Sequence, residues 1–264
     1  MTSTGTSFLP GNVGVRLVGG PTALIEMGGL RFLTDPTFDP PGEHPVGNRV
    51  LVKTRGPAVA ADDIGPVDAV LLSHDQHPDN LDHAGRRLLD IVPVVLTTDS
   101  AAGRLGGTTK VLAPWRHVRL PRPAGGELRV TGVPAQHGPD GTQDLTGEVI
   151  GFVLHGEGLP TVYVSGDNAS LGVVLAVADH LGPIDVAVLF AGAARTPLLD
   201  AYLTLTSDQA ARAARILDAR VVIPVHTEGW KHFTEGPETI APAFARHGAT
   251  GQLRLLAPGE NTTT

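Results

Sequence analysis

The sequence predicts an α/β protein (α+β under some schemes) in which two helix-covered sheets pack face to face as a four-layer αββα sandwich. The chain has 264 residues, and 41% of them are apolar, which is enough for the core of one large domain. Its expected elements follow the order β-rich, βαβ, β-rich, βαβ, as in two similar halves sharing one interface. We therefore expect a single domain over residues 1–264, with short flexible tails at about 1–7 and 261–264.

The first half begins with strands and continues with a βαβ unit. Gly19-Gly20 and Gly28-Gly29 are turn signals between three apolar runs, and a segment rich in Pro and Gly from residue 35 to about 66 predicts a loop. The run DAVLLS is typical of a strand buried on both faces. The expected elements are strands over residues 15–18, 23–26, 30–34, 68–73 and 92–97, and helices over residues 81–89 and 99–105.

The second half repeats this order. A helix expected over residues 207–218 has the clearest signals, because Ser207 can cap it and Asp208 complements its dipole. Ala210 and Leu217 lie on its apolar face. The other expected elements are strands over residues 118–120, 128–133, 150–154, 161–165, 186–190 and 221–225, and a helix over residues 171–181.

Composition limits the classes of function. A formal net charge of −7 argues against a nucleic-acid partner, because phosphate binding needs a basic surface. The absence of cysteine excludes disulfides, thiolate zinc sites and a cysteine nucleophile. Neither a secretory signal nor an apolar run of membrane-spanning length is visible. We expect a cytoplasmic protein that acts on a small molecule away from membranes, with a homo-oligomer left open.

Histidine and aspartate recur just past the ends of predicted strands, where ligand-binding loops gather in open α/β sheets. One such histidine is more often a surface or capping residue, but five residues at equivalent positions would require several independent accidents. Histidine and aspartate without cysteine are typical ligands of a hydrolytic zinc, manganese or iron site. The five are His74 and His77 in SHDQHPDNLD, His137 in PAQHGPD, Asp167 in SGDN and His226 in VHTEGW. Histidines without this placement are interpreted as ordinary surface or core residues: His44, His117, His155, His180, His232 and His247.

These segments resemble the metallo-β-lactamase superfamily, and most closely the branch that includes the ascorbate-6-phosphate lactonases. The resemblance extends from about Val15 to about Trp230. GGPTALIEMGGLRFLTDPTFD is similar to the family's opening hairpin, whose Asp35 would lie near the metals. PAQHG, SGDN and PVHTEGW match the later ligand segments in the right order, and Pro21 replaces a histidine that many relatives carry.

The chain departs from the family signature His-x-His-x-Asp-His, because SHDQHPDN is one residue longer. Gln76 stands at the usual spacing of the second histidine, and Asn80 replaces the last one. We favour a loop bulge that lets His77 take the second-ligand role, since imidazole is a better transition-metal ligand than an amide. A competing alignment that uses Asp82 and His83 would place both residues inside the following helix.

The resemblance implies a divalent metal, zinc before manganese or iron, bound as one ion or two. One site would consist of His74, His77 and His137, with Asp167 bridging to a second site completed by Asp79 and His226. Asn80 would weaken the second site.

The implied reaction is hydrolysis of a small-molecule ester, lactone, amide or phosphoester by a metal-bound hydroxide. Asp79 or Asp167 would orient the nucleophile and carry its proton. Arg195 would contact an anionic group of the substrate, and Trp230 would line the pocket. Two alternatives stay open: a phosphodiesterase or nuclease of the same fold, and a non-catalytic metal-binding protein with a degenerate site.

Overall fold

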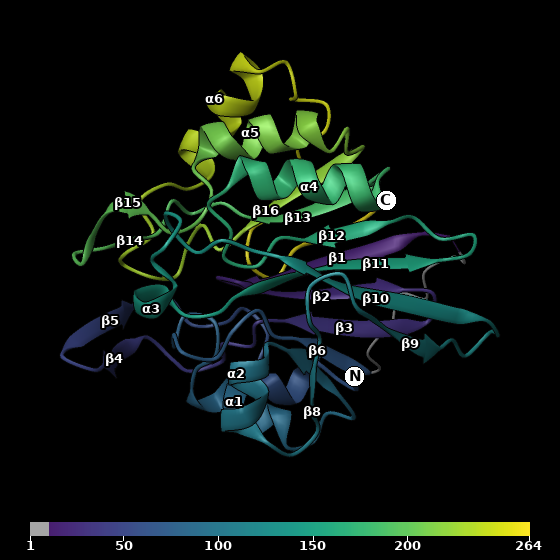
Figure 1. Cartoon of the computed structure of the whole chain (residues 1–264), viewed down its shortest axis with the longest axis horizontal. Coiled ribbons are helices and arrows are strands. Elements are labelled where there is room, and N and C mark those ends of the chain that lie inside the picture. The colour runs from purple at the N-terminus through teal and green to yellow at the C-terminus, as the bar shows by residue number, and fades with distance from the viewer. Residues whose placement is uncertain (1–10) are drawn as a thin grey trace.

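A computed structural model describes residues 11–264 and shows four layers, with two sheets between two layers of helices (Figure 1). The sheets have the strand orders β17-β1-β2-β3-β6-β7-β8 and β16-β13-β12-β11-β10-β9. This arrangement confirms the predicted αββα sandwich. The tail expected at about residues 1–7 lies outside the described residues. Among residues 11–264, no helix is long and apolar enough to cross a membrane.

The first sheet combines an antiparallel meander with a parallel βαβ region. Strands β3, β6, β7 and β8 run parallel. Helix α1 connects β6 to β7, and helix α2 connects β7 to β8. The bounds are β1 Val13–Gly19, β2 Thr22–Met27, β3 Leu30–Thr34, β6 Ala69–Leu71, β7 Val95–Thr97, β8 Thr109–Val111, β17 Asn261–Thr263, η1 Ala61–Asp63, α1 His83–Leu89 and α2 Asp99–Leu105.

The second sheet repeats the plan. Its strands β9 to β12 are antiparallel neighbours, whereas β12, β13 and β16 run parallel. The bounds are β9 His117–Pro121, β10 Glu127–Pro134, β11 Ile150–Gly156, β12 Val162–Val164, β13 Val186–Phe190, β16 Val221–Val225, α3 Gln143–Thr146, α4 Leu171–Leu181, α5 Ser207–Ile216 and α6 Pro237–Arg246.

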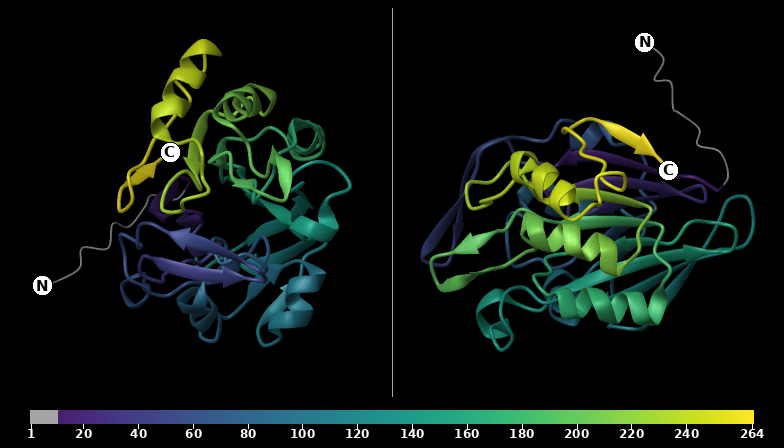
Figure 2. Two further views of the ribbon diagram at one scale, coloured as in Figure 1. Left: turned by 90° about the vertical axis from the view of Figure 1, so that its left-hand side faces the viewer. Right: turned by 90° about the horizontal axis from the view of Figure 1, so that it is seen from above.

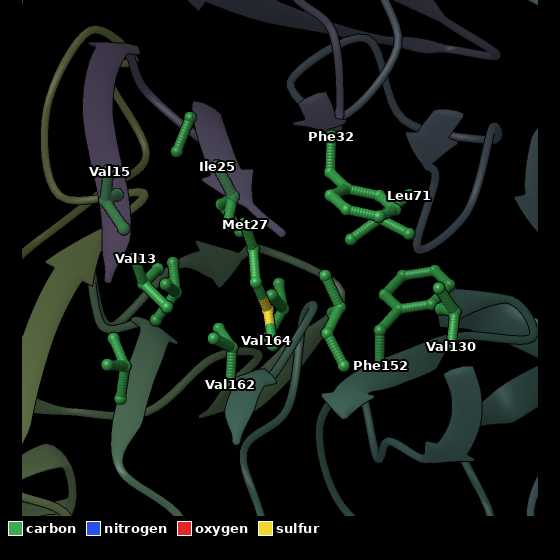
Figure 3. Packing of buried hydrophobic residues seen from close by; sticks show 14 of the residues in the cluster. Val13, Val15, Ile25, Met27, Phe32, Leu71, Val130, Phe152, Val162 and Val164 are labelled. Atoms are coloured by element: carbon green, nitrogen blue, oxygen red, sulfur yellow. The ribbon is translucent and has the colours of Figure 1, made fainter. Parts of the chain in front are cut away.

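The main core lies between the two sheets (Figure 3). Ile25 and Phe32 of the first sheet point toward Phe152 and Val162 of the second, and all four side chains are buried. Two further apolar clusters lie between each sheet and its own helices. A strand with both faces buried consists of a continuous run of apolar residues. The polar residues therefore lie at the ends of these strands.

Two hairpins were not predicted, and both project from the same end of the sandwich (Figures 1 and 2). The expected loop from residue 35 to about 66 contains β4 Gly42–Val46 and β5 Arg49–Lys53, joined by a turn at Gly47 with φ of 59°. The other hairpin consists of β14 Arg195–Thr196 and β15 Leu199–Tyr202. Neither has a strong apolar pattern, because its strands stand apart from the main sheets.

Two further expectations were wrong. Residues 261–264 are not a flexible tail, since β17 pairs with β1 and Thr262 lies opposite Val15.

The N-cap of α5 is Thr206 rather than Ser207. The Thr206 hydroxyl accepts from the Gln209 amide at 3.2 Å, and the Gln209 side chain accepts from the Thr206 amide at 3.0 Å, which forms a capping box. Helix α6 and strand β8 were also not expected.

Candidate metal centre

Three histidines from two segments meet at the ends of the central strands. His74 and His77 lie in the loop after β6, and His137 follows β10. Each offers one ring nitrogen, and the three nitrogens lie within 4.8 Å of one another. His74 Nε2 is 3.0 Å from His77 Nδ1. A tetrahedral zinc ion with bonds of about 2.0–2.1 Å separates its ligand atoms by about 3.3 Å, so the spacing fits a shared ion.

Hydrogen bonds to the opposite ring nitrogens orient two of these imidazoles, those of His74 and His137. His137 Nδ1 lies 2.8 Å from the Leu203 carbonyl oxygen, which can only accept, so Nδ1 carries the proton. His137 Nε2 is then a lone-pair nitrogen, and it is buried without a hydrogen-bond partner. Ser73 Oγ lies 2.9 Å from His74 Nδ1 and donates its own proton to Asp35 Oδ2, so it accepts from Nδ1. Such contacts fix the tautomer of metal-binding histidines in proteins.

Burial keeps two histidines of this group, His74 and His77, uncharged. It lowers the pKa of His74 well below its usual value, and the neighbouring His77 acts in the same direction. Burial likewise lowers the pKa of His77 to about 4. Both rings are therefore neutral at neutral pH, which is the form that binds a metal.

A second group consists of Asp79, Asp167 and His226, whose ligand atoms also lie within 4.8 Å of one another. His226 Nε2 is 3.4 Å from Asp79 Oδ2 and 3.5 Å from Asp167 Oδ1. His226 follows β16 and has φ of 58°, a left-handed conformation that costs energy for a residue with a side chain.

Several polar atoms of this group are buried without partners. They are Asp79 Oδ1, Asp167 Oδ2 and both ring nitrogens of His226. Buried polar atoms are nearly always hydrogen bonded, and leaving them unpaired costs free energy. A divalent cation would bind one oxygen of each carboxylate and one ring nitrogen of His226, and His137 Nε2 offers the same kind of unpartnered atom in the first group, so the residues present fit a metal in both groups.

Asn80, which stands in place of the signature's last histidine, donates from Nδ2 to two carboxylates. The distances are 3.1 Å to Asp35 Oδ2 and 3.2 Å to Asp167 Oδ1. Asp35 also accepts from the amide and hydroxyl of Ser73. Burial raises the pKa of Asp35 to about 7 despite these hydrogen bonds. The structure thus places Asp35 behind the centre, where Asn80 connects it to Asp167.

Gln76 and the two residues of the competing alignment, Asp82 and His83, lie away from the three histidines. The side chain of Gln76 packs against Gly147. His83 is exposed at the start of α1 and contacts Asp39 at 3.1 Å. Asp82 is the N-cap of α1, and its carboxylate accepts from Lys53 at 2.9 Å. His77 therefore joins the first group, through the loop bulge inferred from the sequence.

His232 was interpreted as an ordinary residue, and the structure places it at the centre. Its Nε2 lies 2.9 Å from Asp79 Oδ2. Although burial opposes ionisation, His232 and His226 hold the pKa of Asp79 well below its usual value. The sequence signal was weak, because His232 lies six residues beyond His226 in a segment without regular structure.

The two residues expected to contact a substrate have other partners. The Arg195 guanidinium is 2.6 Å from Asp200 and lies over the ring of Tyr202. Trp230 is 3% exposed, and its ring packs beside His44 at a centroid distance of 5.1 Å. Both arrangements argue against the expected contacts.

Arg49 offers a cation nearer the metal groups. It lies on β5, and its Nη1 donates to Thr196 Oγ1 at 2.6 Å, which joins the two hairpins. Its positive charge contributes to the lowered pKa of His77 after burial and the nearby histidine. Within residues 11–264 it forms no ion pair with a carboxylate within 4.0 Å.

Comparison with known proteins agrees with this geometry. A family model described as a beta-lactamase superfamily domain matches residues 30–227. A UPF0173 metal-dependent hydrolase from Pyrococcus furiosus is 26% identical over 204 residues, which cover 76% of this chain and 83% of the relative. Another from Rubrobacter xylanophilus is 27% identical over 250 residues, covering 89% and 96%.

The solved structures agree at the level of the fold. An isothiocyanate hydrolase from Delia radicum gut bacteria superposes with a TM-score of 0.80 at 21% identity, covering 94% of this chain and 98% of that one. The fold and the paired histidine and aspartate groups define a metal-dependent hydrolase. The chain belongs to the metallo-β-lactamase superfamily.

Proposed function

We propose that this protein hydrolyses a small-molecule ester, lactone, amide or phosphoester with two divalent metal ions, zinc before manganese or iron. The observation that carries the proposal is the pair of ligand groups with buried, unpartnered atoms. His74, His77 and His137 would hold one ion, and Asp79, Asp167 and His226 the other. Bound there, a divalent metal supplies a Lewis acid and lowers the pKa of water to about 7.

The two aspartates would act as catalytic residues. Asp79 is held through Oδ2 by His232, so its Oδ1 is free to face the reacting groups. Asp167 is held through Oδ1 by Asn80, and its Oδ2 is unpartnered. Whichever of these two oxygens does not bind the ion can orient the attacking water and accept its proton. His232 is a positioning residue, because it acts through Asp79.

Arg49 supports an anionic substrate. Its guanidinium is not neutralised by a carboxylate among the described residues, and it lies at the hairpin end of the sandwich near His77. A guanidinium binds carboxylate or phosphate groups through charge-assisted hydrogen bonds. A lactone or ester with an anionic substituent would satisfy both the metal centre and Arg49, in keeping with the resemblance to the phosphorylated-lactone branch.

The test is turnover after controlled metal loading. Chelator-treated protein would be reconstituted separately with Zn²⁺, Mn²⁺ and Fe²⁺ and assayed with lactones, esters, amides, phosphodiesters and an isothiocyanate. We expect metal-dependent hydrolysis of at least one anionic lactone or ester, and its loss in Asp167→Asn. Preference for phosphodiesters would favour the nuclease alternative.

Asn80 motivates the second candidate function, a metal-binding protein without catalysis, because it removes one family ligand. Stoichiometric metal without turnover of any substrate in the panel would support that function and contradict the first. His232 counts against it, since a second histidine beside Asp79 strengthens the site that Asn80 weakens.

A further inference from the structure

A separate cluster of metal-type ligands lies where the β4–β5 hairpin meets the start of α1. It consists of Asp39 in the loop after β3, His44 on β4 and His83 at the first position of α1. One ligand atom from each lies within 4.8 Å of the others. None of the three belongs to the metal centre, so the cluster requires its own explanation.

The spacing of the three ligand atoms suits a small cation. Asp39 Oδ2 is 3.1 Å from His83 Nδ1 and 3.9 Å from His44 Nδ1. These distances lie on either side of the roughly 3.3 Å that separates ligand atoms in tetrahedral zinc sites with bonds of about 2.0–2.1 Å. The His83 side chain is 77% exposed, which leaves the fourth position open to water.

The hydrogen-bonded pair of Asp39 and His83 does not explain the position of His44, whose ring nitrogen Nδ1 has no partner. Asp39 accepts from the His83 ring and from the backbone amides of His83 and Ala84, and these contacts account for Asp39 and His83 alone. The His44 side chain is 6% exposed, and its Nδ1 is buried without a partner and faces Asp39. Because an unpaired buried nitrogen costs free energy, a ligand at this point would stabilise the fold.

The charges around the cluster also favour a cation. Burial lowers the pKa of His44, so its ring is neutral. Burial opposes ionisation of Asp39, but hydrogen bonds from His83 and Ala84 lower the pKa of that carboxyl below its usual value. Two positive charges lie nearby, and a carboxylate pairs with each: Asp82 with Lys53 at 2.9 Å, and Asp75 with Arg86 at 3.8 Å. A cleft of about 330 Å³ lined by His44 and His83 gives an ion access.

We propose that Asp39, His44 and His83 bind a Zn²⁺ ion that ties the β4–β5 hairpin to α1. The ion would hold the strand pair that carries Arg49. Imidazole and carboxylate are the ligand types of zinc sites without cysteine. The proposal concerns binding alone and does not depend on the proposed reaction.

The test is Zn²⁺ titration of the chelator-treated full chain, with the number of ions counted by calorimetry. His83→Ala removes an exposed ligand outside the metal centre, and His117→Ala removes an exposed histidine of β9 as the matched control. We expect His83→Ala to bind one ion fewer than the wild type, and His117→Ala to bind the same number. His44→Phe should repeat the loss with the ring volume kept.

Hydrogen exchange gives a second readout. Zn²⁺ should slow amide exchange in β4 and β5 of the wild type, and should have no such effect in His83→Ala. An unchanged ion count in His83→Ala would overturn the proposal. Loss of more than one ion in that variant would also overturn it, because the cluster would then not be a separate site.

Discussion

His77 has a ring that its surroundings keep neutral, although histidine ordinarily titrates near neutral pH. Burial lowers its folded-state pKa to about 4, against 6.5 when exposed. Between these values the unfolded chain binds a proton that the folded protein does not. The stability contributed by His77 is therefore present above about pH 6.5 and lost as the pH falls toward 4, by about 3 kcal/mol.

The corresponding experiment is urea unfolding of the metal-free protein at several pH values between 4 and 7. His77→Gln should lose less stability on acidification than the wild type, because the titrating group is gone. His117→Gln, an exposed histidine on β9, is the control and should follow the wild type. Equal losses in His77→Gln and the wild type would contradict the lowered pKa of His77.

His232 contributes to metal binding indirectly, because it contacts the proposed metal ligand Asp79 and is not itself one of the proposed ligands. Removing a partner that orients a ligand typically weakens metal binding by about 10–100-fold. We expect His232→Ala to weaken the ion at Asp79, Asp167 and His226 by that factor while the ion at the three histidines keeps its affinity. Competition with a chelator measures both affinities.

The matched control for this variant is His247→Ala, whose ring contacts Asp208 at 2.7 Å and belongs to neither metal group. If His232→Ala and His247→Ala bind both ions equally well, His232 does not position Asp79.

Single residues were predictable where a short-range rule applied. His74, His137, Asp167 and His226 each lie within three residues of the end of a strand, so the end of the strand fixes their place. His232 could not be placed in this way, because a segment without regular structure returns it to the centre. Its contact with Asp79 joins residues 153 positions apart.

At the scale of elements, the β4–β5 and β14–β15 hairpins carry the two arginines considered for substrate binding, Arg49 and Arg195. Buried strands such as β13 and β16 were predicted from continuous apolar runs with the observed bounds. The β4–β5 and β14–β15 hairpins lack such runs because they pack little of their surface into the core. Their register depends on turn geometry and on contacts such as Arg49 with Thr196.

These hairpins also separate the roles of two arginines. Arg49→Ala should raise KM for an anionic substrate by about 10–100-fold, the equivalent of one charge-assisted hydrogen bond, with a smaller change in kcat. Arg195→Ala should change KM little, because Asp200 already neutralises Arg195. Steady-state kinetics of both variants, on the best substrate and a neutral analogue, measures the difference. A larger effect at Arg195 would contradict this assignment.

At the scale of the whole molecule, the chain closes on itself at the edge of the first sheet. β17 adds to β1, the first strand described, so Val13 and Thr264, 251 positions apart, are hydrogen-bonded neighbours. The two-sheet sandwich itself was predictable, since the order of apolar runs specifies it. The closing strand was not, because the NTTT sequence reads as a polar tail.

Deletion of residues 261–264 tests the closing strand. We expect the unfolding free energy to fall by about 1–3 kcal/mol, the range for loss of a few backbone hydrogen bonds. Metal content should stay the same, because the deleted strand lies away from the ligand loops. An unchanged unfolding midpoint in urea would show that these residues behave as a tail.

The central claim is that two groups of side chains from both halves of the sandwich hold metal ions. Anomalous diffraction from crystals of the zinc-loaded protein, measured at the zinc absorption edge, tests it most directly. One peak should lie within bonding distance of His74, His77 and His137, and a second within bonding distance of Asp79, Asp167 and His226. Metal-loaded crystals with no anomalous peak at either group would contradict the claim.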